Sequence, residues 1–185
     1  MAHGVCPWWL GYWLLSPVRK LRESPRNVLS PFIRGGMVVL EPGCGMGFFT
    51  LEAARLAGPS GRVVAVDVQP KMLAALERRA RKAGLADRID RRLAEPASLG
   101  VADLAGEVDV VLAFHVVHEL PDPETFFGEV CAALRPGGSL LMAEPKGHVS
   151  GDHFARSVAS AGHAGLRLSG DVEGLWGRTA RLVKP

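Results

Sequence analysis

Two carboxylates and three glycines stand where a ligand could be held between neighbouring strands. Glu41 ends an apolar run and is followed by Gly43, Gly45 and Gly47. A second apolar run ends at Asp67, 20 residues beyond Gly47. Glycines let the backbone turn tightly and approach a ligand, and a carboxylate accepts hydrogen bonds from both ribose hydroxyls. The spacing therefore predicts a βαβ unit that binds an adenosine-containing ligand.

Three histidines are candidates for proton transfer. His115 and His118 follow the apolar run 108–113, and His148 follows the run 139–144. Ligands of open α/β sheets bind at the carboxyl ends of strands, so these imidazoles are placed where a general base would act. A packing or capping role is the alternative for each of them.

The same region also raises the question of a metal. Glu119 and Glu144 lie close in sequence to these histidines, and imidazole with carboxylate could ligate a metal ion. However, the order H-x-x-H-E differs from the H-E-x-x-H of zinc helices and falls at a junction between strand and loop. We therefore expect no metal.

The elements that position these residues alternate between apolar runs and helical segments. This alternation predicts an α/β fold with a doubly wound, mostly parallel seven-stranded sheet and a short N-terminal helical cap. We expect the cap to span residues 1–34 and the main domain 35–185, with residues 24–36 joining them. The expected strands lie near 37–41, 62–67, 88–93, 108–113, 139–144, 165–170 and 178–183, and the expected helices near 46–57, 70–83, from 121–124 to 135–138, and 151–162.

Composition limits the class of protein. A chain of 185 residues with 48% apolar and 22% charged residues is typical of one globular domain. The net charge is +3, and arginines cluster in 76–84 and 87–92 without aromatic neighbours, which favours a solvated surface over nucleic-acid binding. The three cysteines, Cys6, Cys44 and Cys131, are widely spaced, as in reduced, cytoplasmic proteins.

The N-terminal segment carries an aromatic cluster of Trp8, Trp9, Tyr12 and Trp13. At helical spacing, several of these rings would share one face. They could form a lid over a small-molecule substrate, pack as a cap on the core, or make weak contact with a membrane surface. The apolar run is too short and interrupted to span a bilayer.

Five motifs in order resemble the class I S-adenosylmethionine-dependent methyltransferases, close to the quinone C-methyltransferases. The resemblance covers residues 37–151. The motifs are Val39-Leu-Glu-Pro-Gly-Cys-Gly-Met-Gly47, Val64-Ala-Val-Asp67 with Met72, Asp109-Val-Val-Leu112, His118-Glu-Leu-Pro-Asp122 and Leu134-Arg-Pro-Gly-Gly-Ser-Leu-Leu141.

The resemblance implies a role for each residue of the glycine loop. The backbone at Gly43, Gly45 and Gly47 would approach the methionine and ribose of the cofactor, because side chains there would fill the ligand's space. Glu41 resembles the acid that reaches the ammonium group, and Asp67 the acid that accepts both ribose hydroxyls. Cys44 is expected to fit the tight turn.

It also implies contacts to the rest of the cofactor. Val68 and Met72 would lie against adenine, and Glu95 stands where the family often has an Asp for the adenine amino group. Here the sequence departs from the usual Gly-Asp, and a proline follows Glu95 directly. Phe114, with His115, would line the floor below the sulfonium.

The resemblance implies transfer of a methyl group from S-adenosylmethionine. Because the core fold takes up nearly all of the chain, we expect a small acceptor, apolar or aromatic in character. A nicotinamide dinucleotide site is an alternative, but its third glycine would fall one position later, where this chain has Phe48. A second alternative is a non-catalytic S-adenosylmethionine-binding module or a subunit of a hetero-oligomeric methyltransferase. The acceptor and the oligomeric state stay open.

Overall fold

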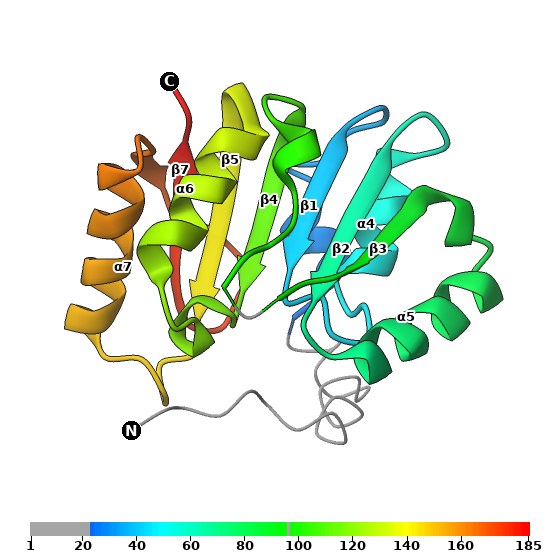
Figure 1. The fold of residues 1–185 in the computed structure, drawn as a ribbon, viewed down its shortest axis with the longest axis horizontal. Coiled ribbons are helices and arrows are strands. Elements are labelled where there is room, and N and C mark those ends of the chain that lie inside the picture. Colours follow the sequence, from blue (N-terminus) through cyan, green and yellow to red (C-terminus); the bar gives the residue numbers. More distant parts are fainter. Residues whose placement is uncertain (1–22, 96) are drawn as a thin grey trace.

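Seven strands form one sheet in the order β3-β2-β1-β4-β5-β7-β6 in the computed structural model, which describes residues 23–95 and 97–185 (Figure 1). Strands β1 to β5 are parallel, and β7 runs antiparallel to both of its neighbours. The order reverses between β1 and β4, where such sheets bind ligands. The strands are β1 (Val38–Pro42), β2 (Arg62–Asp67), β3 (Ile89–Leu93), β4 (Val108–Phe114), β5 (Leu134–Glu144), β6 (Arg167–Gly170) and β7 (Arg178–Val183).

Helices cover both faces of this sheet. Helices α6 and α7 lie in front of it in Figure 1 and α4 lies behind it. The helices are α3 (Pro25–Leu29), α4 (Thr50–Ala57), α5 (Pro70–Lys82), α6 (Pro123–Ala133) and α7 (Gly151–His163), with short 3₁₀ turns η1 (Ala86–Arg88), η2 (Ala102–Leu104) and η3 (Val117–Glu119). The predicted doubly wound, seven-stranded fold is confirmed.

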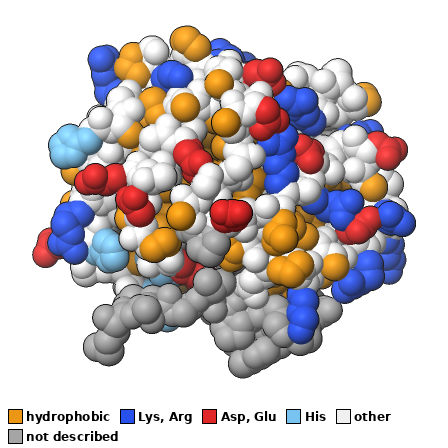
Figure 2. Space-filling view, in the orientation of Figure 1, with side chains coloured by type: hydrophobic (Ala, Val, Ile, Leu, Met, Phe, Trp, Pro, Cys, Tyr) orange, Lys and Arg blue, Asp and Glu red, His pale blue; other side chains and the backbone are white. Residues whose placement is uncertain are grey.

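Burial explains which segments became strands. Nearly every residue of β1, β2 and β4 is buried, because a parallel sheet covered on both faces leaves no solvated side. The edge strand β3 is the charged one, and its arginines are paired: Arg91 with Glu77, and Arg92 with Asp103. These pairs agree with the expectation of a solvated basic surface, and Figure 2 shows blue and red side chains interspersed there.

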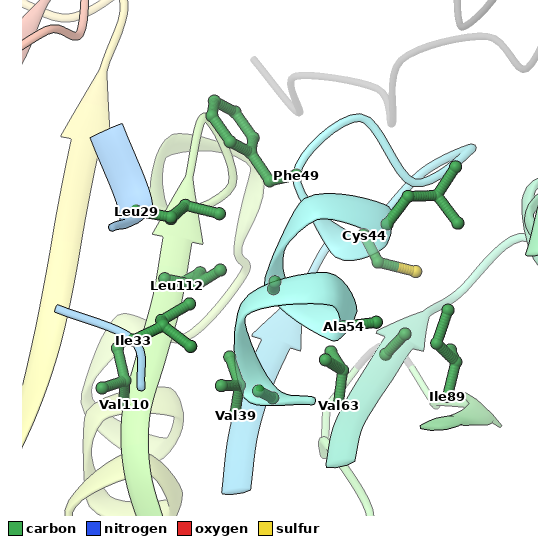
Figure 3. Close-up of a cluster of buried hydrophobic side chains, with 14 of the residues drawn as sticks. Leu29, Ile33, Val39, Cys44, Phe49, Ala54, Val63, Ile89, Val110 and Leu112 are labelled. Atoms are coloured by element: carbon green, nitrogen blue, oxygen red, sulfur yellow. The ribbon is translucent and has the colours of Figure 1, made fainter. Parts of the chain in front are cut away.

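The segment at 24–36 does more than join a cap to the core. Ser24 caps α3 by accepting a hydrogen bond from the backbone of Asn27 (3.4 Å). Leu29 and Ile33 are buried in the cluster of Figure 3, where they lie near the β4 side chains. This stretch is therefore part of the hydrophobic core.

Two predicted boundaries were wrong. The first helix begins at Thr50 and not near residue 46, because Gly45 and Gly47 have positive φ and the Gly47 N–H closes a turn onto the Cys44 carbonyl (3.0 Å). The stretch 135–138 ends α6 but belongs to β5, where the ladder to β4 shifts its register. Lys184 pairs with this bulge through backbone hydrogen bonds to 137 and 138.

The predicted aromatic cluster at 8–13 lies outside the described residues. The division of the chain at residue 34 stays a prediction. Within 23–95 and 97–185, no helix is both long enough and apolar enough to cross a membrane.

Candidate functional site

The glycine loop follows β1 directly, and its three glycines are required for different reasons. All three have positive φ: +69° at Gly43, +53° at Gly45 and +81° at Gly47. A Cβ at Gly43 would come 2.8 Å from Val116 Cγ2, and a Cβ at Gly47 would overlap Leu76 Cδ1. Around a Cβ at Gly45, by contrast, no described atom lies within 4 Å. Of the three glycines, Gly45 is therefore the one where a side chain would extend into space that a ligand could occupy.

Asp67 ends β2 and is bound to this loop. Its Oδ2 accepts a hydrogen bond from the Gly45 N–H (2.9 Å), and its Oδ1 accepts one from the Gln69 N–H (2.8 Å). Burial raises the pKa of Asp67, and these backbone donors offset part of that rise. The Val68 N–H adds a third backbone donor. The two carboxylate oxygens have about four lone pairs between them, so a site remains that a ribose hydroxyl could use.

Glu41 is the most strongly perturbed carboxyl in the described part of the site. It is 5% exposed, and burial raises its pKa to about 8. The Thr50 hydroxyl lies near enough to oppose part of this rise but forms no hydrogen bond with any described residue, and the nearby charge of Asp67 adds to the rise. Glu41 Oε2 has no hydrogen-bond partner among the described residues. A buried acceptor without a partner is costly, and a cationic donor would relieve that cost.

The residues expected near adenine differ in exposure. Met72 is buried in a small cluster with Met46 and Ala75, whereas Val68 is 38% exposed.

The Cys44 side chain points into the core cluster of Figure 3, and burial raises the pKa of its thiol. Only the backbone of Cys44 therefore belongs to the loop surface, and its N–H is bonded to the Val66 carbonyl (3.1 Å).

Glu95 lies in an exposed turn after β3, and hydrogen bonds to helix α6 hold this turn in place. Glu129 of α6 accepts hydrogen bonds from the Ser98 hydroxyl (2.6 Å) and the Leu99 N–H (2.8 Å). Glu95 itself bridges to Ser98 as an isolated pair. The contact of Glu95 with adenine stays a prediction, because no side-chain hydrogen bond or ion pair joins Glu95 to the loop or to Asp67 within the described structure.

Phe114 and His115 end β4 at the same edge of the sheet. Phe114 is buried and packs edge-on against Phe49, with ring centroids 4.8 Å apart. His115 has φ +60°, the one left-handed residue other than glycine in the described chain. Its N–H donates to the Ala143 carbonyl (2.7 Å). A non-glycine residue held in this conformation is often found at functional sites.

His118 is oriented by a buried carboxylate. Its Nδ1 is hydrogen-bonded to Glu144 Oε2, while Glu144 Oε1 accepts the N–H of Val117 (2.8 Å). Glu144 is 1% exposed, so this pairing takes place out of water. The bond to Glu144 raises the pKa of His118, although desolvation opposes the rise. The arrangement resembles a base held by a third group.

His148 lies beside His118 but makes a different kind of contact. The two rings are nearly parallel, with centroids 6.4 Å apart and planes 20° from each other. His148 is exposed, whereas the His118 side chain is 20% exposed. Among the residues that the structure describes, no three His, Cys, Asp or Glu side chains are arranged to hold a metal.

Sequence reasoning considered Glu144 only as a metal ligand and missed its bond to His118. A signal was present, because Glu144-Pro145 repeats the pattern of Glu41-Pro42, an acid and a proline at the end of a buried strand. Val116 was also missed, although it packs on Gly43 and so joins the β4 end to the glycine loop.

Gly177 should be indispensable for the position of Glu144. It has φ +150°, and a Cβ there would overlap the Glu144 carbonyl oxygen. Gly170 has nearly the same φ, +148°, with no described atom near its Cβ, so Gly170→Ala is a matched control. We expect Gly170→Ala to cost about 1–3 kcal/mol of unfolding free energy from backbone strain. Gly177→Ala should cost about 1–3 kcal/mol more from overpacking. Urea unfolding measures both, and equal losses would contradict the steric argument.

These residues suit a cofactor that combines a cation with ribose hydroxyls. Glu41 offers a buried acceptor without a described partner, and Asp67 offers free lone pairs. No described atom lies within 4 Å of a Cβ placed at Gly45, which leaves room for a ligand beside the loop. The three meet at the carboxyl ends of β1 and β2, beside the point where the strand order reverses.

Comparison with known proteins identifies the family to which this chain is similar. A methyltransferase domain model matches residues 33–169. An arsenite methyltransferase of Halobacterium salinarum is 35% identical over 59% of this chain and 27% of its own length. A ubiquinone biosynthesis O-methyltransferase of Bradyrhizobium diazoefficiens is 33% identical over 76% of this chain and 51% of its own length. The chain thus spans from about a quarter to about half of these curated relatives.

A solved structure agrees in fold over nearly the whole chain. A SAM-dependent methyltransferase from Aquifex aeolicus superposes with a TM-score of 0.85 at 23% identity, and covers 98% of this chain and 100% of its own. At this identity the likeness shows the fold alone. The family model, however, matches well over half of the chain. The chain belongs to the class I methyltransferase domain family, whose cofactor is S-adenosylmethionine.

Proposed function

We propose that the chain methylates a hydroxyl oxygen on a small, apolar or aromatic acceptor, with S-adenosylmethionine as the methyl donor. One observation carries this proposal: His118, next to the predicted cofactor loop, is held by the buried Glu144. When bound, S-adenosylmethionine supplies a methyl group that is already activated by its sulfonium. The protein then has to hold the acceptor in line and remove its proton.

His118 is the candidate for that proton. Its Nδ1 is bonded to Glu144, whereas its Nε2 lies 4.0 Å from Glu119 Oε1, beyond hydrogen-bond distance. Nε2 is therefore the ring atom that could accept the proton of an acceptor hydroxyl. Glu144 fixes the ring orientation and would stabilise the imidazolium formed when Nε2 takes up the proton. The contact between Val116 and Gly43 places the segment leading to His118 next to the cofactor loop.

The other two histidines are assigned supporting roles. The left-handed His115 turns the chain sharply after β4, and its N–H bond to Ala143 fixes that turn. His148 presents an exposed ring nearly parallel to His118, a suitable wall for a flat acceptor. Glu41, Asp67 and the glycine loop are assigned to the cofactor.

The relatives suggest two kinds of acceptor, arsenite and a ubiquinone precursor. Thiolates are the soft ligands expected around a soft acceptor atom such as arsenic. Among the described residues, Cys44 is buried in the core and Cys131 lies on α6, so neither belongs to the His118 region. The described site therefore favours the hydroxyl acceptor.

His118→Gln should lower kcat for an acceptor hydroxyl by about 10²–10⁴-fold, the usual contribution of a general base. Formation of S-adenosylhomocysteine from a panel of phenols, catechols and hydroquinones measures the rate. Cofactor affinity should not change. His148→Gln, which leaves the Glu144 bond intact, is the matched control and should change KM more than kcat. An unchanged kcat in His118→Gln would sink the assignment.

The pH profile gives a second readout of the same base. His118 must be neutral to accept a proton, and Glu144 raises its pKa above 6.5. The value of kcat/KM should therefore rise with pH through that raised pKa. In Glu144→Gln the rise should move to lower pH. Cofactor binding without turnover on any acceptor would instead support the non-catalytic module.

A further inference from the structure

We propose that a second site, at the opposite end of the sheet from the cofactor loop, binds a phosphate-type oxyanion. A cavity of about 180 Å³ opens among the starts of β1, β4 and β5. Its charged lining consists of Arg34, Arg135, Arg181 and Asp109, a net charge of +2. The proposal is independent of methyl transfer, because nothing in this cavity contributes to the cofactor loop.

Arg181 is the residue best placed to bind the anion. Its guanidinium lies over the Phe32 ring, 5.5 Å from the centroid, which holds the group by cation–π contact. Its Nη2 reaches the Ser139 hydroxyl only at 3.5 Å, and its buried Nε has no partner among the described residues. A buried donor of this kind gains most from an incoming oxyanion.

The other charged groups leave the positive charge available. Asp109 is already engaged: its Oδ1 pairs with Arg135 Nε (2.7 Å), and its Oδ2 accepts the Val38 N–H (2.8 Å). It neutralises one guanidinium of the three. The Arg34 side chain makes no hydrogen bond or ion pair with any described residue; its backbone N–H is engaged, with Met37 Sδ.

The lining combines this charge with an apolar wall. Pro31, Phe32, Met37 and Val110 contribute the wall, and Ser139 contributes a hydroxyl. Guanidinium groups match the spaced oxygens of phosphate and carboxylate, and several converging on a concave surface favour the ion with more charge. We therefore commit to a phosphate group, either free or at the end of a small ester.

The test is thermal unfolding of the full chain in low-millimolar sodium phosphate, with sodium chloride matched for ionic strength. Binding to the folded state should raise Tm in a saturable way. Arg181→Gln and Arg34→Gln should abolish that rise. Arg156→Gln is the matched control, because it removes an exposed arginine on α7 and should behave as wild type.

Each outcome decides the proposal. A phosphate-dependent rise in wild type and Arg156→Gln, absent in both cavity variants, supports it. The variants should still be stabilised by S-adenosylhomocysteine, which shows that they are folded. Equal rises in all four proteins would mean general salt exclusion and would overturn the proposal, as would no rise in wild type. Glycerol 3-phosphate and acetate serve as further probes in the same assay. A larger rise in Tm with glycerol 3-phosphate than with free phosphate would assign the site to a phosphate ester. A rise with acetate alone would contradict a phosphate site.

Discussion

Glu41→Gln is expected to make the cofactor-free protein more stable at pH 8 and to weaken its hold on S-adenosylmethionine. In the folded chain the pKa of Glu41 is about 8, against 4.5 for an ordinary glutamate, because the carboxyl is buried. A glutamine of the same shape carries no charge to bury. The charge that costs stability is the one that would pair with the cofactor's ammonium group.

The sign of the pH dependence follows from proton binding. Between pH 4.5 and about 8, folded Glu41 holds a proton that the unfolded chain has lost. The contribution of Glu41 to the free energy of unfolding is therefore fully present below pH 4.5. It is lost as pH rises towards 8, by an amount on the order of 4 kcal/mol. Glutamine does not titrate, so the variant should lack that loss.

Urea unfolding at pH 5, 6.5 and 8 measures the difference between wild type and Glu41→Gln. The free energy of unfolding of Glu41→Gln should increase relative to that of wild type as pH rises. For Glu173→Gln, an exposed control, it should change with pH as in wild type. Affinity for S-adenosylmethionine should fall by tenfold or more in Glu41→Gln, since a hydrogen bond to a charged group is worth about 1.5–3 kcal/mol. Parallel stability profiles for wild type and Glu41→Gln would mean that Glu41 is ionised in the free protein.

Asp67→Ala should lower both cofactor affinity and stability. The lost contacts to the ribose hydroxyls should weaken S-adenosylmethionine binding by roughly 1.5–3 kcal/mol. In addition, the Gly45 and Gln69 N–H groups lose their acceptor, which should lower the free energy of unfolding by about 1–3 kcal/mol.

Asp109→Ala separates these two effects. Asp109 also accepts a backbone N–H, from Val38 at 2.8 Å, but it lies at the other end of the sheet. Its removal should reduce stability in a similar way and leave S-adenosylmethionine affinity at the wild-type value. If calorimetric titration found the same affinity loss in both variants, Asp67 would act only through the fold.

The sequence was sufficient to predict the fold because the strands are short apolar runs between helices with clear ends. Pro70 at the start of α5 and Gly84 after its end are examples. The meeting of Glu41 and Asp67 was predictable for the same reason, since parallel strands end at one edge.

Details that depend on packing could not be predicted in this way. Glu144 and His118 are 26 residues apart, and their bond requires β4 and β5 to pair with Phe114 opposite Ala143. Periodicity does not fix that register. The late start of α4 at Thr50 depends on the left-handed backbone at Gly45 and Gly47, a conformation that the residue pattern allows but does not require.

The most direct test of the cofactor site is calorimetric titration of S-adenosylmethionine and S-adenosylhomocysteine into wild type, Gly45→Ala and Gly84→Ala. Gly45 and Gly84 have φ of +53° and +66°, and no described atom lies within 4 Å of a Cβ at either. Both substitutions should therefore cost about 1–2 kcal/mol of stability. Wild type and Gly84→Ala should bind both ligands, and Gly45→Ala should lose them. Equal binding by all three proteins would contradict a cofactor site at the glycine loop.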